Sequence, residues 1–189
     1  MFLLIPISYL IGSFPFAEIY VYMTKGIKLS QTGTKNIGVA NAFQTGGVKA
    51  GLLTVIVEVL KVLFPYYFVY TYGSSELVLY ISFIAVLLGI MFPITTNFKG
   101  GKGRTAGGLI MFLIAPIPTL ILLASWTIII LTTKKAMLSS ILPTFFIPVL
   151  FFIFSDMISF YFSLIIFTLY LLSAKKERND FLHYQITKE

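Results

Sequence analysis

A short basic loop holds the residues best suited to binding a phosphate. The segment Lys99-Gly100-Gly101-Lys102-Gly103-Arg104-Thr105, called the glycine–lysine loop below, combines three glycines, three cations and a hydroxyl. Glycines tolerate backbone conformations that let successive N–H groups converge on one point, and the cations add positive charge. Thr105 is expected to cap a helix that starts at Ala106. The segment therefore predicts an anion site, although a cytoplasmic connection between membrane spans also favours Lys and Arg.

A second polar segment carries further hydrogen-bond donors. It runs from Thr24 to Gly47, is called the polar loop below, and contains hydroxyls, amides, glycines and Lys35 but no carboxylate. Its length is unusual for a connection with no other purpose. Such donors suit phosphate or sugar hydroxyls, and the alternative is a solvated loop without a ligand.

The composition places the elements that carry these loops in a membrane. Of 189 residues, 58% are hydrophobic and 11% are charged, against roughly a quarter charged in soluble domains. A water-soluble fold of this size cannot bury so much apolar side chain. We therefore expect an all-α polytopic membrane protein, with residues 1–189 forming a single domain.

Charge and residue usage exclude several classes of partner and site. The net charge is +7, but the cations lie in short connections between apolar runs, so no nucleic-acid partner is expected. The chain has no cysteine, which excludes disulfides and thiolate chemistry. With a single histidine, a His-rich metal centre is excluded too, and we expect neither a metal nor a cofactor.

Apolar runs approach the length of about 20 residues that a spanning helix needs. The clear candidates are Phe2–Met23, Val48–Tyr72, Glu76–Thr95, Ala136–Phe154 and Met157–Ser173. Between Arg104 and Lys134, cytoplasmic placement of both cations requires an even number of crossings, which two short helices turning at Pro116-Ile117-Pro118 would supply. The prediction is about seven transmembrane helices, two of them short, with the amino terminus outside and the carboxyl terminus cytoplasmic.

Two charged residues are expected inside the membrane. Glu58 and Lys61 share one face of a helix at a spacing of three, so they can form an ion pair. Such a pair is costly in a bilayer and indicates function by default, although a pair that only joins helices is equally compatible. A small transporter is disfavoured, because no inverted repeat is visible and the donors cluster at one face. Glu18, late in the first helix, is interpreted as an interfacial carboxylate.

Both loops resemble those of the bacterial acyl-phosphate-dependent glycerol-3-phosphate acyltransferase family (PlsY family). Residues 98–103 are identical to the family's F-K-G-G-K-G, and residues 33–41 read G-T-K-N-I-G-V-A-N against G-S-G-N-x-G-A-T-N. Gly12-Ser13, Glu18 and Lys61 also fit. The resemblance implies transfer of a fatty acyl group from acyl phosphate to the 1-hydroxyl of glycerol 3-phosphate. The product would be lysophosphatidic acid for phospholipid synthesis, made without a metal at the cytoplasmic face of the inner (plasma) membrane.

The resemblance also implies the residues of the site. Those expected to take part in catalysis are Lys102, Thr34, Asn36 and Lys61. Those expected to bind substrate are Ser13, Lys35, Gly38, Asn41, Lys99, Gly100, Gly101, Gly103, Arg104 and Asn179. The expected partners are acyl phosphate, glycerol 3-phosphate and membrane lipid, and the sequence does not indicate an oligomeric state.

No Ser-His-Asp set is visible, so direct attack by the substrate hydroxyl is expected, with a phosphate oxygen or Glu58 as proton acceptor. Several family positions differ. An Arg beyond the first motif is Gln44, and two His positions are Ile90 and Lys176. Acyl transfer remains the predicted function, and these departures motivate an alternative of another class, a catalytically degenerate relative that binds a phosphorylated lipid or metabolite without acyl transfer.

Overall fold

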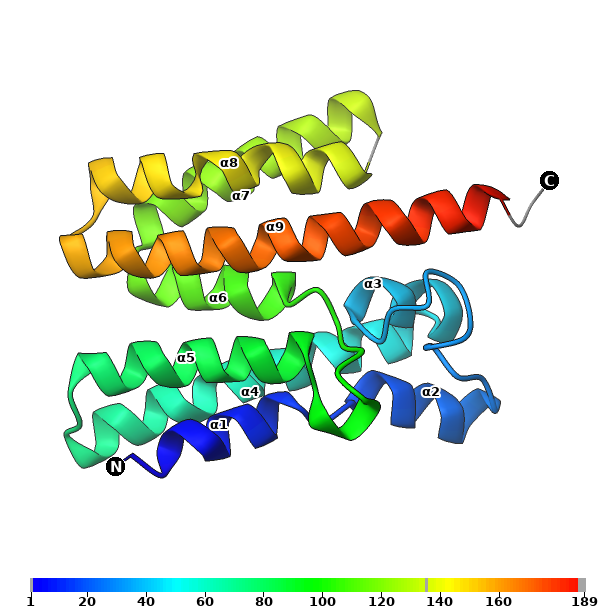
Figure 1. The fold of residues 1–189 in the computed structure, drawn as a ribbon, viewed down its shortest axis with the longest axis horizontal. Coiled ribbons are helices and arrows are strands. Elements are labelled where there is room, and N and C mark those ends of the chain that lie inside the picture. The colour runs from blue at the N-terminus through cyan, green and yellow to red at the C-terminus, as the bar shows by residue number, and fades with distance from the viewer. Residues whose placement is uncertain (1, 135, 187–189) are drawn as a thin grey trace. The chain divides into compact units, whose positions relative to one another are not determined.

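The computed structural model describes the backbone of residues 2–134 and 136–186, and the side chains of residues 2–134, 139 and 141–173. Every regular element within these residues is a helix (Figure 1). The chain divides into two compact units, one of residues 1–107 with 180–189 and one of residues 108–179. The single-domain organisation stays a prediction.

The first unit contains the elements that carry both loops. Its helices and helical turns, in chain order, are α1 (Leu4–Gly12), α2 (Phe16–Lys25), α3 (Val39–Asn41), the π-helical turn η1 (Ala42–Gly46), α4 (Val48–Tyr72), α5 (Glu76–Met91), the 3₁₀ turn η2 (Ile94–Thr96) and the start of α6 (Arg104–Ile114). α4 and α5 form an antiparallel hairpin joined by residues 73–75 (Figure 1). The start of α4 and the end of α5 therefore lie at the same end of this unit.

The predicted first helix, Phe2–Met23, is broken in the structure. α1 ends at Gly12 and α2 begins at Phe16, because Pro15 has no N–H with which to continue the helical hydrogen-bond ladder. The end of α1 touches α5, since a Cβ built on Gly12 would lie 2.4 Å from the carbonyl oxygen of Val86. Only glycine permits this approach, so the break lies directly against α5.

The second unit contains the rest of α6, α7 (Pro116–Thr133), α8 (Ala136–Phe154) and α9 (Met157–Ile186). The prediction of two short helices turning at the prolines is wrong in two respects. The turn is at Ala115, and Pro116 begins α7, where its missing N–H costs no hydrogen bond. Only α6 is short, with 11 residues against 18 in α7. α9 also runs beyond the predicted end at Ser173.

Four of the described helical stretches are long and apolar enough to cross a membrane by length and composition. They are Leu4–Lys25, Val48–Tyr72, Glu76–Thr96 and Pro116–Thr133, and shorter apolar helices cover Arg104–Ile114, Ile141–Phe154 and Met157–Ser173. The all-helical class is confirmed. The number of crossings and the sides on which the termini lie stay predictions.

Asp156 caps α9 outside the apolar segments. Its Oδ2 accepts a hydrogen bond from the N–H of Ile158 at 3.1 Å, and its Oδ1 accepts one from the hydroxyl of Ser159. These hydrogen bonds stabilise the carboxylate and hold the pKa of Asp156 below its ordinary value of 3.8. The charged cap therefore stabilises the folded chain above about pH 3.8, and this contribution is lost as the pH falls through the lowered pKa.

Asp156→Ala is expected to lower the stability of the protein by about 1 kcal/mol at neutral pH, the usual cost of a lost helix cap. Thermal unfolding in detergent, followed by circular dichroism at pH 7 and at pH 3, measures the effect. The difference between the wild type and the variant is expected to shrink at pH 3, whereas Asp156→Asn keeps a cap that does not titrate. An Asp156→Ala variant as stable as the wild type at pH 7 would contradict the role of this cap.

Candidate functional site

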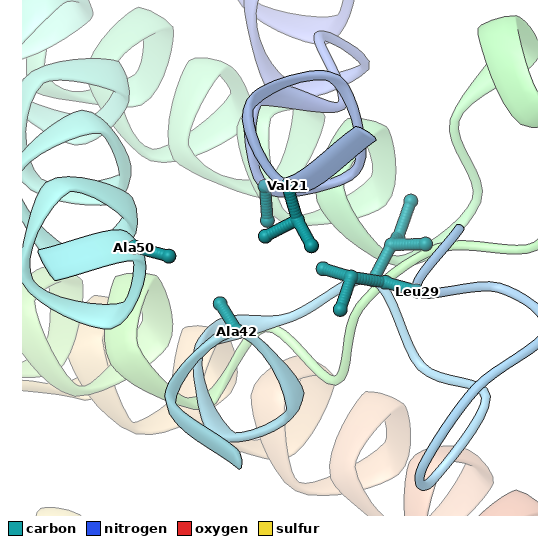
Figure 2. Close-up of a cluster of buried hydrophobic side chains, with 6 residues drawn as sticks. Val21, Leu29, Ala42 and Ala50 are labelled. Carbon is teal, nitrogen blue, oxygen red and sulfur yellow. The ribbon is translucent and has the colours of Figure 1, made fainter. Parts of the chain in front are cut away.

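The polar loop folds around a small apolar core. Apolar side chains from the loop, α2 and α4 are buried together: Ala17, Val21, Leu29, Ile37, Ala42 and Ala50. Figure 2 shows Val21, Leu29, Ala42 and Ala50 converging between the ribbons that carry them. Removing this apolar surface from water and headgroups stabilises one loop conformation, so the polar residues of the loop are held on a fixed frame.

Asn41 holds the polar loop from inside. Its Nδ2 donates to the carbonyl oxygens of Leu29 at 3.0 Å, Thr32 at 2.9 Å and Asn36 at 2.8 Å. Its Oδ1 accepts a hydrogen bond from the hydroxyl of Thr45 at 2.9 Å, and the side chain is 1% exposed. These contacts give Asn41 a structural role in the loop, and its predicted role as a substrate ligand stays a prediction.

The tip of the polar loop carries the other predicted residues. The Oδ1 of buried Asn36 accepts a hydrogen bond from the N–H of Gly38 at 3.0 Å. Thr34 and Lys35 are exposed. Lys35 has a φ of 54°, a left-handed conformation that costs a residue other than glycine about 1–2 kcal/mol. Strained backbone of this kind is common where a loop binds a ligand.

Two charged side chains of α2 fix the polar loop at its ends. The carboxylate of Glu18 accepts hydrogen bonds from the N–H of Ser30 at 3.0 Å and from its hydroxyl at 2.5 Å. The Nζ of Lys25 donates to the carbonyl oxygen of Thr45 at 3.1 Å. Glu18 is therefore more than an interfacial carboxylate, because it holds the start of the loop against α2.

The glycine–lysine loop is folded back on the end of α5. The N–H of Gly100 donates to the carbonyl oxygen of Met91 at 3.2 Å, and the N–H of Gly101 donates to that of Ile90 at 2.9 Å. The expectation that these two N–H groups converge on an anion is therefore wrong, because both satisfy carbonyls at the end of α5. α6 begins at Arg104, so Thr105 lies inside its first turn and does not cap a helix starting at Ala106.

The two loops meet at their glycines. A Cβ built on Gly38 would lie 3.6 Å from the Cα of Gly101 and 3.9 Å from the backbone nitrogen of Lys102. The prediction that the loops lie together is confirmed. Cations come from both sides of this contact: exposed Lys35 and Lys99, and half-buried Lys102 and Arg104. Because neither loop contains a carboxylate, the charges that the two loops themselves bring to this contact are all positive, which suits anionic ligands.

Lys61 and Ser13 lie at the break between α1 and α2. The predicted ion pair is confirmed, with Lys61 Nζ 3.3 Å from Glu58 Oε1. The same Nζ donates to the carbonyl oxygens of Gly12 at 3.2 Å and Phe14 at 2.8 Å. The hydroxyl of buried Ser13 donates to the carbonyl oxygen of Tyr9 at 2.9 Å. The catalytic role of Lys61 and the binding role of Ser13 stay predictions.

Two further expectations concern residues away from the loops. Asn179 lies in α9 of the second unit, and its side chain is outside the described residues. Within the part of the chain that the structure describes, no three His, Cys, Asp or Glu side chains group as a metal site would require.

The family profile described as glycerol-3-phosphate acyltransferase matches residues 2–183. The chain belongs to this family. The glycerol-3-phosphate acyltransferase of Fusobacterium nucleatum subsp. nucleatum is 35% identical over 167 residues, covering 87% of this chain and 86% of that relative. The protein of that name from Bacillus subtilis is 38% identical over 141 residues, covering 74% of this chain and 72% of the relative.

Solved structures of a family member share the fold. PlsY (YgiH), an integral membrane glycerol 3-phosphate acyltransferase, in its glycerol 3-phosphate form aligns with a TM-score of 0.82 at 27% identity. Its lysophosphatidic acid form aligns with a TM-score of 0.77 at 25% identity. Each alignment covers 96% of this chain and 91% of the other. Together with the apolar helices, this confirms the membrane localisation and the PlsY-family resemblance.

One residue beside the candidate site was missed by sequence reasoning. Thr95, in the turn before the glycine–lysine loop, donates its hydroxyl to the carbonyl oxygen of Ser13 at 2.5 Å. The sequence carries no signal for this hydrogen bond, because the two residues are 82 positions apart. The hydrogen bond becomes visible only once α1 and α5 are packed together.

Proposed function

We propose that the chain transfers a fatty acyl group from acyl phosphate to the 1-hydroxyl of glycerol 3-phosphate, giving lysophosphatidic acid. The contact between two cationic loops at Gly38 and Gly101 carries this proposal. Two phosphorylated substrates need two cationic binding segments held side by side, so that their reacting atoms approach each other. The names of the relatives, and the glycerol 3-phosphate and lysophosphatidic acid forms of the solved PlsY, support the acceptor and the product.

Acyl phosphate is an activated mixed anhydride, so positioning and charge stabilisation are the main tasks of the protein. The 1-hydroxyl oxygen forms a bond to the acyl carbonyl carbon, and the bond from that carbon to the phosphate oxygen breaks. Inorganic phosphate leaves with the electron pair. The hydroxyl proton passes to a phosphate oxygen, which we favour over Glu58 because the carboxylate of Glu58 is already paired with Lys61 in α4.

The positions of the cations support a division of roles between the loops. Lys99 and Lys102 would hold the phosphate of the acyl donor and offset charge on the carbonyl oxygen in the transition state. Thr34, Lys35, Asn36 and Arg104 would hold glycerol 3-phosphate. Gly38, Gly100, Gly101 and Gly103 would shape the two loops. The acyl chain would extend between helices into lipid at the cytoplasmic leaflet.

The test uses the purified full chain in lipid vesicles with palmitoyl phosphate. Glycerol 3-phosphate is expected to trigger release of inorganic phosphate and formation of an equal amount of lysophosphatidic acid, measured by a phosphate assay and mass spectrometry. Binding of glycerol 3-phosphate without phosphate release would contradict the proposal. It would favour the degenerate alternative, which the buried Ile90 at the position of a family His also favours.

A further inference from the structure

The break in the first membrane helix leaves consecutive carbonyl oxygens without helical partners, and two distant side chains satisfy them. Lys61 donates to the carbonyl oxygen of Gly12, at the end of α1, and to that of Phe14 inside the break, which also accepts from the N–H of Phe16 at 3.0 Å. Thr95 donates to the intervening carbonyl oxygen of Ser13. A carbonyl oxygen left unpaired among apolar side chains is costly, because no water replaces the lost hydrogen bond. Lys61 and Thr95, called the break clamp below, therefore hold this break from α4 and from η2.

The ammonium of Lys61 is fully committed to these contacts. A lysine has three donor hydrogens, and Lys61 makes three contacts, to Gly12 O, Phe14 O and Glu58 Oε1. The residue is 6% exposed. An ammonium that contacted a phosphate would have to give up at least one of these partners.

The contacts of the break clamp also lie shortly before each loop along the chain. On one side, Phe14 leads into α2, whose Glu18 holds Ser30 at the start of the polar loop. On the other side, Thr95 precedes the glycine–lysine loop by four residues, and Thr96 beside it donates to the carbonyl oxygen of Lys99 at 3.1 Å. The two loops then meet again at Gly38 and Gly101.

We infer that Lys61 and Thr95 are positioning residues that set the two substrate loops in register, and that neither touches substrate. This inference rests on the proposed function, since the loops are taken to hold the two substrates. It replaces the catalytic role that the sequence predicts for Lys61 and adds Thr95, whose hydroxyl is already donated to the carbonyl oxygen of Ser13. Loss of either residue should then misalign two substrates that each loop still binds.

The experiment compares three variants of the full chain in vesicles. They are the single variant Thr95→Val, the double variant that carries Lys61→Met and Glu58→Gln, and the variant that combines all three changes. The Glu58→Gln change prevents an unpaired buried carboxylate, and Thr95→Val tests the inference independently if the lysine variant does not fold. Thr95→Ser keeps the donor. Thr127→Val is the matched control, because Thr127 lies in α7, outside both loops, where its hydroxyl donates to the carbonyl oxygen of Leu123.

Backbone hydrogen exchange is expected to accelerate in residues 26–47 and 92–103 of both clamp variants, with no change in residues 73–75 at the far end of the unit. The kcat for acyl transfer should fall about tenfold or more, with one glycerol 3-phosphate still bound per chain. The combined variant should lose little more than the worse single one, because the two residues act on one break. Thr95→Ser and Thr127→Val should match the wild type.

Unchanged hydrogen exchange in the two loops would overturn the inference. So would a Thr95→Val variant with wild-type kcat beside a Lys61 variant whose kcat falls 100-fold or more, because that result would indicate direct contact between Lys61 and substrate. Failure of the wild type to transfer acyl groups would instead refute the proposed function. In that case, the hydrogen-exchange measurement would still show whether Lys61 and Thr95 hold the two loops.

Discussion

Replacing Lys102 with alanine is expected to lower the kcat for acyl transfer about 100-fold or more, the usual effect of removing one group that stabilises developing negative charge. Lys102 follows Gly101, whose N–H is fixed to α5, and its backbone nitrogen faces Gly38 of the polar loop. This is where the reacting carbonyl and the departing phosphate would lie. Initial rates with palmitoyl phosphate and glycerol 3-phosphate measure the effect.

Lys49→Ala is the matched control for this charge loss. Lys49 is an exposed cation in the first turn of α4, outside both loops. Its removal changes the net charge of the chain by the same amount and should leave kcat within about twofold, as for most surface substitutions. Near-normal turnover of Lys102→Ala, or equal losses in both variants, would remove Lys102 from the proposed chemistry and leave only a general effect of charge.

Sequence reasoning was most accurate where a single local signal decided the structure. The observed bounds of α4, Val48–Tyr72, are those predicted, because an apolar run of spanning length is flanked by Gly47 and Gly73. Gly73, in the left-handed conformation, ends the helix at low cost, and Gly47, also at positive φ, directly precedes its first residue. The adjacency of the two loops was also predictable, because the distribution of positive charge put both at one end of the helices.

The errors arose where a hydrogen-bond partner far along the chain determines the local structure. The sequence shows that Gly100 and Gly101 carry N–H donors, but their acceptors at Met91 and Ile90 depend on how the chain folds back on α5. The break after Gly12 had a visible signal in Pro15, which an uninterrupted apolar run outweighed. Thr95 had no comparable signal. Composition therefore predicts where helices and charged loops lie, whereas tertiary hydrogen bonds decide which backbone donors are already paired.

These tertiary hydrogen bonds change the way in which the glycine–lysine loop is expected to bind an anion. Instead of presenting a row of N–H groups to an anion, the glycines Gly100 and Gly101 let the backbone lie against α5 and bring Lys102 to Gly38. The charge of the lysines, rather than backbone dipoles at these two glycines, would then bind the phosphate. Positioning of that charge depends on the close contact at Gly100.

Gly100→Ala is therefore expected to disable the site without removing any charge. A Cβ on Gly100 would lie 2.2 Å from the carbonyl oxygen of Ile90, 2.4 Å from Pro93 Cδ and 2.7 Å from the carbonyl oxygen of Met91. These neighbours are backbone and ring atoms that cannot rotate away, so the loop must shift by about 1 Å. Such a displacement should lower kcat by about 100-fold, and overpacking should cost about 1–3 kcal/mol of stability.

Gly108→Ala tests whether the effect comes from this contact or from loss of a glycine in general. Gly108 lies inside α6, and a Cβ there meets nothing within 4 Å. Alanine at a helical position should be neutral or stabilise the protein by about 0.5–1 kcal/mol, and turnover should be unchanged. Rates and melting temperatures of both variants decide the matter. A Gly100→Ala variant with wild-type turnover would show that Lys102 does not need the loop to lie against α5, and the proposed geometry of the site would then fail.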